Sequence, residues 1–123
     1  MSSSVFSDIS KTEWLGDSRY FFILPDKYPV SSGHLLIISK ENRSDFFDLS
    51  DKEKSELPEL IIAAKKLIEK EHQPTGYNIG MNCGSSAGQT VFHFHCHVIP
   101  RYDGDMVDPR GGVRHSVEGK GYY

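Results

Sequence analysis

Histidine alternates with apolar residues along residues 91–99, which read Val-Phe-His-Phe-His-Cys-His-Val-Ile. This period of two predicts a β-strand, because successive side chains of a strand point to opposite faces of a sheet. His93, His95 and His97 would then share one face. The alternate residues would face an apolar core: Phe92, Phe94, Cys96 and Val98. The chain therefore needs a sheet that is covered on one face and displays a row of imidazoles on the other.

Three further segments read as strands between turn-forming residues: 18–24, 34–39 and 77–82. The run Leu35-Leu36-Ile37-Ile38 does not alternate, which predicts a strand that is covered on both faces. The first two of these strands would form a hairpin with a long loop.

The clearest helix follows Ser50, which is a good N-cap, and Glu53 occupies the position of its capping-box partner. Pro58 predicts a bend in this helix or a helix start near it, because proline removes a backbone donor. Residues 44–49 predict a short helical turn, and residues 73–76 end the helix. Apolar residues recur at helical spacing and form one stripe: Leu57, Leu60, Ile61, Ala64, Leu67 and Ile68.

Composition limits the kinds of protein that this chain can be. Its 123 residues fit one domain, and a net charge of −3 does not favour bulk nucleic-acid binding. Cys83 and Cys96 form no disulfide framework or CxxC metal motif, which favours a reducing, cytoplasmic location. No signal peptide is predicted, and no apolar run approaches the ~20 residues that span a bilayer. Strands around one main helix predict an α+β domain with an antiparallel sheet, and a second subunit would cover its open edge or face.

The row of histidines allows three interpretations. It is a solvated strand face, a source of zinc ligands, or a set in which one imidazole is a nucleophile that its neighbours orient. Spacing alone does not separate the last two. Asn82, Gln89 and Thr90 are neutral donors around a loop of small residues, which favours a bound phosphate. Carboxylates, the usual hydrogen-bond partners of metal-bound histidines, are missing from this stretch.

The run His93-Phe94-His95-Cys96-His97-Val98-Ile99 resembles the motif of the histidine-triad (HIT) superfamily of nucleotide hydrolases and transferases. The resemblance covers roughly residues 18–114, and the run from Gly104 to Arg114 is similar to that of bacterial diadenosine-tetraphosphate-hydrolase-like members. It implies a HIT-like fold, with an antiparallel sheet of about five strands, one main helix and a short helix, joined to a second subunit. A single domain would occupy residues 1–123, with a C-terminal tail at 115–123.

The resemblance implies catalytic roles for four histidines. His95 would attack the α-phosphorus and carry a covalent nucleotidyl group. His97 would donate to the phosphate and assist the leaving group. His93 and His34 would belong to the hydrogen-bond network that orients them.

Substrate-binding roles follow from the same resemblance. Asp26 would hold the ribose hydroxyls, and Leu24 would line the base pocket, to which Phe6 and Ile9 are further candidates. Arg110 and Arg114 are either substrate contacts or ordinary surface arginines. Three positions match residues that contact phosphate oxygens: Asn82, Gln89 and Thr90.

The implied activity is cleavage at the α-phosphate of a nucleoside 5′-monophosphate derivative, either a dinucleoside polyphosphate or a nucleoside phosphoramidate. The expected substrate carries a purine, with adenosine preferred, and the chemistry requires no cofactor or metal. The N-terminal cysteines of family members with an extra zinc site are missing here. An alternative of a different class is a nucleotide-binding regulatory module with little turnover. The expected protein is a homodimer that binds neither nucleic acid nor membranes.

Overall fold

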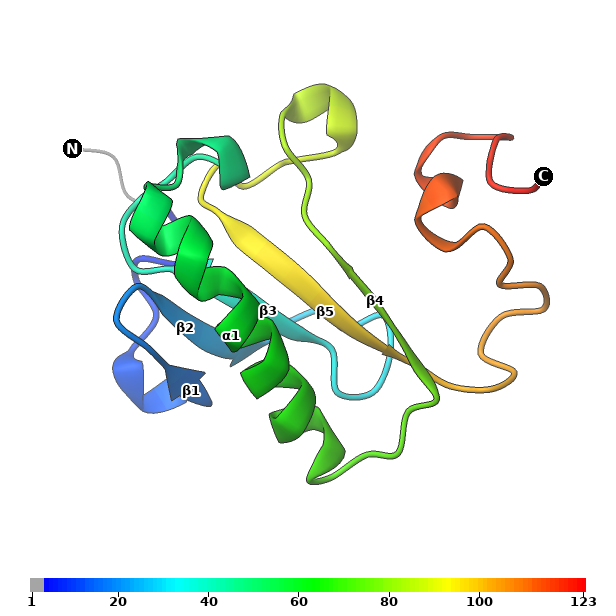
Figure 1. Ribbon diagram of the computed structural model, residues 1–123, viewed down its shortest axis with the longest axis horizontal. Coiled ribbons are helices and arrows are strands. Elements are labelled where there is room, and N and C mark those ends of the chain that lie inside the picture. The colour runs from blue at the N-terminus through cyan, green and yellow to red at the C-terminus, as the bar shows by residue number, and fades with distance from the viewer. Residues whose placement is uncertain (1–3) are drawn as a thin grey trace.

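A computed structural model describes residues 4–123 of the chain (Figure 1). Five strands form one antiparallel sheet in the order β1-β2-β3-β5-β4. Their bounds are β1 Gly16–Asp17, β2 Phe21–Pro25, β3 Leu35–Ser39, β4 Gly76–Gly80 and β5 His95–Arg101. One long helix, α1, spans Asp51–Glu69, and short 3-10 helices lie at Lys11–Glu13, Phe46–Asp48, Ser85–Ala87 and Gly112–Ser116. The predicted α+β fold, with about five antiparallel strands and one main helix, is confirmed.

The start of α1 follows the predicted capping box. The Ser50 hydroxyl accepts from the Glu53 N–H at 3.2 Å, and the Glu53 carboxylate accepts from the Ser50 N–H at 2.6 Å. These reciprocal bonds satisfy donors that the first helical turn leaves unpaired. The helix therefore begins at Asp51 and runs through Pro58, so a start near the proline is not seen.

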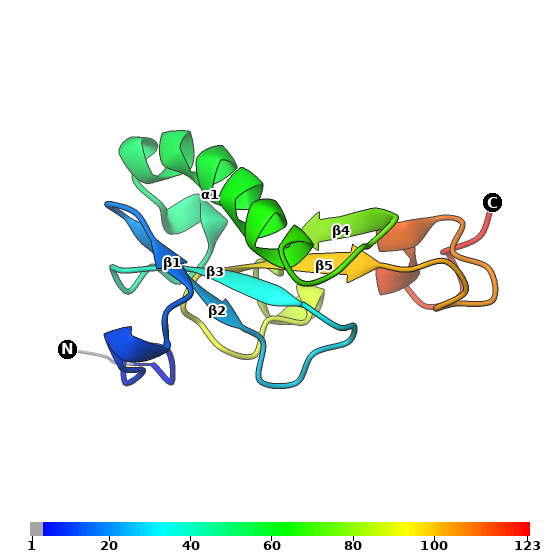
Figure 2. The ribbon, with the colours of Figure 1, turned by 90° about the horizontal axis from the view of Figure 1, so that it is seen from below.

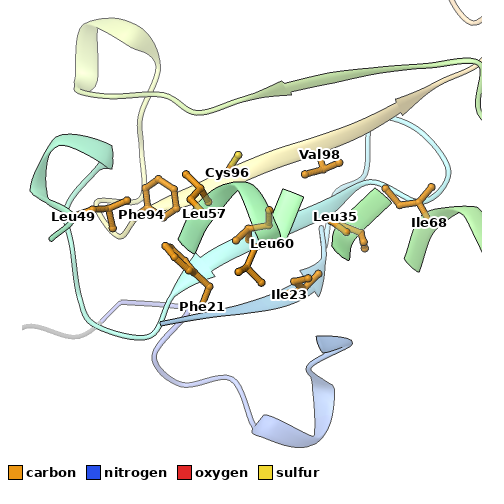
Figure 3. Packing of buried hydrophobic residues seen from close by; sticks show 12 residues of the cluster. Phe21, Ile23, Leu35, Leu49, Leu57, Leu60, Ile68, Phe94, Cys96 and Val98 are labelled. Carbon is orange, nitrogen blue, oxygen red and sulfur yellow. The ribbon is translucent and has the colours of Figure 1, made fainter. Parts of the chain in front are cut away.

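The main core lies between α1 and one face of the sheet (Figures 2 and 3). Phe94, Cys96 and Val98 enter this core, each at most 1% exposed, as the alternation predicted. Phe92 does not follow them and is 53% exposed. β5 begins at His95 and the β3–β5 ladder ends at the pair Ile38↔His95, so Phe92 lies outside the sheet.

The N-terminal segment covers the opposite face of the sheet. Phe6, Ile9 and Trp14 pack there against buried side chains of β2 and β3, and Figure 2 shows this segment on the side away from α1. Every residue of β3 is consequently buried, as its non-alternating sequence predicted.

The two edges of the sheet differ from the sequence prediction. Residues 18–20 form a turn, so β2 begins at Phe21, and a two-residue strand that was not predicted, β1, pairs with it. Two residues are too few to show a periodicity. At the other edge β4 ends at Gly80 rather than at residue 82, and the C-terminal segment lies beyond it (Figure 1).

Two findings bear on the expected environment of the chain. Among residues 4–123, no helix combines the length and the apolar composition that crossing a membrane requires. Cys83 and Cys96 are both free, and burial raises the pKa of the Cys96 thiol to about 12. Cys96 is therefore an unreactive core thiol.

Replacing Ser50 with alanine should lower the free energy of unfolding by about 1 kcal/mol, because one reciprocal capping bond of α1 is lost. Urea unfolding followed by circular dichroism would measure it. Ser55→Ala is the matched control, since Ser55 is exposed within the same helix and alanine favours helices. An equal loss in both variants would contradict the capping role.

Candidate active site

The pairing of β3 with β5 brings two histidines together near one end of the ladder. His34 immediately precedes β3, and His97 pairs with Leu36. His34 Nε2 lies 2.9 Å from His97 Nδ1. Asp26, just after β2, completes the cluster, with its Oδ2 atom 3.3 Å from His34 Nε2 and 3.8 Å from His97 Nδ1.

Backbone groups determine which ring nitrogens of this pair carry hydrogen. The Val30 N–H can only donate, so His34 Nδ1, which lies 3.2 Å away, accepts. Neutral His34 therefore carries its hydrogen on Nε2 and donates it to His97 Nδ1. Neutral His97 must then carry its own hydrogen on Nε2, on the far side of the ring. An N–H donor is thus left for the cavity that His97 lines.

His95 is held in the opposite tautomer. Its Nδ1 atom lies 2.8 Å from the carbonyl oxygen of His93, which can only accept. His95 Nδ1 therefore donates, and in the neutral ring Nε2 keeps its lone pair, which is the nucleophilic form of imidazole. The rings of His95 and His97 meet edge to face with centroids 5.3 Å apart, so a lone pair and a donor border one cavity.

His93 is enclosed rather than displayed beside the other two histidines, and it is 1% exposed. Its Nε2 atom donates to the Ser39 carbonyl at 2.7 Å, and its Nδ1 atom accepts from the Ser4 hydroxyl at 2.6 Å. A zinc site on the three histidines of the motif would need a free nitrogen from His93, and both of its nitrogens are in use.

Burial keeps the imidazoles of the cluster neutral. It lowers the pKa of His97 to about 4, and the neighbouring His95 and His34 act in the same direction, while Asp26 opposes them. Burial also lowers the pKa of His34 and of His93. His34, His93 and His97 are therefore uncharged near neutral pH, as the tautomers above require.

A cavity of about 820 Å³ lies in front of His95 and His97. It brings together these two with other residues named from the sequence, namely Leu24, Asp26, Phe6 and Ile9. The cavity is also lined by five residues that no sequence pattern marked: Val5, Glu13, Lys27, Tyr28 and Val91. Most of these are close neighbours in sequence of predicted positions, and they carry no pattern of their own.

The loop between β4 and β5 holds the three residues predicted to contact phosphate. Asn82 and Thr90 are exposed there. Gln89 is buried, and its Oε1 atom accepts from the Gly84 N–H at 2.7 Å. Its Nε2 group donates to the Ser44 carbonyl at 2.6 Å and to the Val91 carbonyl at 3.2 Å. The Gln89 amide therefore braces the loop, and its own donors are taken by backbone carbonyls.

Asp26, His34 and His97 have the composition of a metal site but not its hydrogen pattern. Their ligand atoms lie 2.9 to 3.8 Å apart, close to the ~3.3 Å edges that tetrahedral zinc bonds of 2.0–2.1 Å imply. A metal on His34 Nε2 would move the ring hydrogen to Nδ1, against the Val30 N–H. Asp26, His34 and His97 therefore fit a chain of hydrogen bonds rather than a metal centre.

Arg110 and Arg114 lie in the C-terminal segment and have local partners. Arg110 pairs with Asp108 at 3.0 Å, and Arg114 donates to the Lys120 carbonyl at 3.1 Å. Within the described chain, no contact joins either arginine to the histidine cluster.

Comparisons with known proteins point to one family. A family model described as HIT domain matches residues 9–104. An uncharacterised HIT-like protein of Mycoplasma genitalium is 36% identical over 109 residues, which covers 83% of this chain and 75% of that protein. An AP-4-A phosphorylase of Mycobacterium tuberculosis is 39% identical over 79 residues, which covers 63% of this chain and only 40% of the phosphorylase. The solved structure of a HIT family hydrolase from Clostridium thermocellum has a TM-score of 0.70 and 30% identity, covering 85% of this chain and 95% of that one.

Lowering the pH from about 6.5 to about 4 should destabilise the protein through His97. The pKa of His97 is about 4 when folded, against an unperturbed value of 6.5, so the unfolded chain binds more protons in this window. The contribution of His97 to the free energy of unfolding is therefore fully present above pH 6.5 and is lost as the pH falls toward 4. Urea denaturation at several pH values would measure the slope.

His97→Asn is the comparison that isolates this contribution, because other groups also titrate in acid. The variant should lose stability less steeply than the wild type over the same window. Identical slopes would show that folding does not lower the pKa of His97.

Proposed function

The chain belongs to the HIT family, and on that premise we propose that it is a nucleotide hydrolase or nucleotidyl transferase acting at the α-phosphate of its substrate. The observation that carries the proposal is the opposed pair of tautomers at one cavity. His95 offers a lone pair on Nε2, and His97 offers an N–H beside it. A nucleophile and a donor for developing negative charge are the two requirements of nucleotidyl transfer.

In the first step, the lone pair of His95 Nε2 attacks the α-phosphorus and forms a P–N bond. The bond from phosphorus to the leaving group breaks, and the leaving group departs with its electron pair. Charge on the phosphate oxygens is stabilised by the His97 N–H, and we add Asn82 and Thr90 of the β4–β5 loop as further donors. In the second step, water attacks the nucleotidyl-histidine, the P–N bond breaks, and its electron pair returns to His95 while a proton is released.

His93 and His34 act on this reaction through their neighbours. The His93 carbonyl holds the hydrogen on His95 Nδ1, and the His34 N–H holds the hydrogen of His97 on Nε2. Each interaction keeps the reacting face of a catalytic imidazole in the required state. We therefore propose both as positioning residues, and Gln89 as the residue that keeps the phosphate loop in place.

The cavity suits an adenosine nucleotide. Its volume of about 820 Å³ lies within the usual range for small-molecule sites, and Leu24, Phe6 and Ile9 give it an apolar wall for a purine. The carboxylate of Asp26 borders the same cavity and would accept hydrogen bonds from the ribose hydroxyls. The likeness to an AP-4-A phosphorylase supports adenosine as the base, in a dinucleoside polyphosphate or a nucleoside phosphoramidate.

We also propose that two copies of the chain associate through the β4 edge of the sheet. Among residues 4–123, β4 pairs with β5 alone, so its outer edge offers backbone groups without a strand partner, and Ile79 on it is 42% exposed. Such an edge is usually covered in a native protein. A second copy would pair with it and extend the sheet.

His95→Asn should reduce AMP release from adenosine 5′-phosphoramidate by more than about 10³-fold, because the nucleophile is lost. The assay is run in EDTA, and His115→Asn in the C-terminal segment is the matched control with full activity. The wild type should also yield an acid-labile AMP adduct on His95 when the reaction is quenched. Turnover by His95→Asn at the wild-type rate would refute the nucleophile, and tight AMP binding without turnover in the wild type would favour a regulatory module.

Ile79→Glu should convert the dimer into a monomer, because it places a charge on the edge strand that the second copy would cover. Size-exclusion chromatography with light scattering gives the molar mass. Leu15→Glu is the control, since Leu15 is 50% exposed and immediately precedes β1, which forms the opposite edge of the sheet. A dimeric Ile79→Glu protein, or a monomeric wild type, would exclude this interface.

A further inference from the structure

The N-terminal segment, residues 4–9, forms part of the cavity wall without belonging to the sheet. Val5, Phe6 and Ile9 line the 820 Å³ cavity. The Phe6 ring lies against His95 with centroids 5.1 Å apart, and against His93 with centroids 5.6 Å apart. The position of this segment therefore sets the shape of the site next to the proposed nucleophile.

One hydrogen bond joins this segment to the rest of the described chain. The Ser4 hydroxyl donates to His93 Nδ1 at 2.6 Å, across 89 positions of sequence. The remaining hydrogen bonds of residues 4–9 are internal turns, such as that from the Ser7 N–H to the Ser4 carbonyl. The other attachments are apolar contacts of Phe6 and Ile9, which are not directional.

The hydrogen pattern of His93 makes this bond specific. Its Nε2 hydrogen is committed to the Ser39 carbonyl, so Nδ1 can only accept in the neutral ring. Burial lowers the pKa of His93, which keeps the ring in that acceptor form. A hydroxyl at position 4 therefore meets a fixed, enclosed acceptor, and an apolar side chain there would leave Nδ1 without a partner.

We propose that Ser4 is a positioning residue that acts through Phe6. By holding the segment at His93, it keeps the Phe6 ring against His95 and so maintains the apolar wall on which the nucleotide base rests. This inference rests on the proposed nucleotide site.

The two cavities beside the segment support this role. Phe6 and Ile9 line the 820 Å³ cavity on one side and a second cavity of about 370 Å³ on the other. The segment is thus the partition between them. If the segment moved away, the two cavities would join into one larger, open space, and the apolar wall beside the base would be lost.

The effect should fall on binding rather than on chemistry. The group that fixes the His95 tautomer is the His93 carbonyl, not the His93 ring. The ring also keeps its bond to Ser39 when Ser4 is changed. Losing the Ser4 hydroxyl would therefore loosen the wall and leave the nucleophile in its reactive form.

The experiment compares Ser4→Ala, Ser4→Thr and Ser7→Ala in the full chain. Ser4→Ala should raise the dissociation constant of AMP and the KM for adenosine 5′-phosphoramidate by about 3- to 10-fold, with kcat within about twofold of wild type. Hydrogen exchange of the amides in residues 5–9 should become faster. Ser4→Thr keeps the hydroxyl and should restore all of these values. Ser7→Ala is the matched control, because Ser7 is exposed and, within residues 4–123, its hydroxyl makes one long hydrogen bond, to the Ser4 N–H at 3.4 Å.

The outcomes separate this inference from the proposed function. Wild-type affinity and unchanged exchange in Ser4→Ala would overturn it, and so would a fall in kcat at constant KM, which would place the action of Ser4 on chemistry. If the wild type binds AMP without turnover, the proposed reaction fails while AMP affinity still tests Ser4. If the wild type does not bind AMP, the proposed nucleotide site fails, and with it the claim that Ser4 supports nucleotide binding.

Discussion

The pairing of β3 with β5 is the constraint on which the site depends. Its register sets His95 opposite Ile38 and His97 opposite Leu36, so both imidazoles emerge on the face away from α1. A slip of one residue would turn them into the core and expose Cys96, because strand side chains alternate between faces. The ladder also stops at Ile38, and this stop releases residues 91–94 from the sheet. His93 is then free to reach the Ser39 carbonyl, so one ladder produces the two displayed imidazoles and the enclosed one.

Groups that cannot change their hydrogen-bonding role determine the state of those that can. A histidine ring is able to donate or accept at either nitrogen, but a backbone N–H only donates and a carbonyl only accepts. The Val30 N–H determines the tautomer of His34, and His34 in turn determines the tautomer of His97. The His93 carbonyl determines the tautomer of His95. The acidic neighbour Asp26 does not charge His97, since burial outweighs it and holds the pKa of His97 near 4. The proposed reaction thus begins with His97 as a neutral donor, which has no charge to lose before substrate binds.

The parts of the fold that could be predicted are those encoded by neighbouring residues. The alternation of Phe94, Cys96 and Val98 and the capping box of Ser50 are local, and the structure has them where the sequence indicated. The exposure of Phe92 was missed because it depends on where a different strand ends. The bracing role of Gln89 depends on the Ser44 carbonyl, 45 positions away, and no local pattern encodes such a contact. Leu24 and Asp26 were placed at the site by resemblance, and nothing in their own periodicity marks them.

The cavity is built from two kinds of structure that differ in how firmly they are held. His95 and His97 stand on a central strand whose other face is packed under α1, so they move only if the core opens. Phe6 and Ile9 belong to a segment that one hydrogen bond joins to the rest of the described chain, so its opening would break fewer directional contacts. In the proposed enzyme, chemistry is therefore placed on the rigid part and recognition of the base on the adaptable part. Such a division lets the base wall admit and release a nucleotide without disturbing the geometry of the nucleophile.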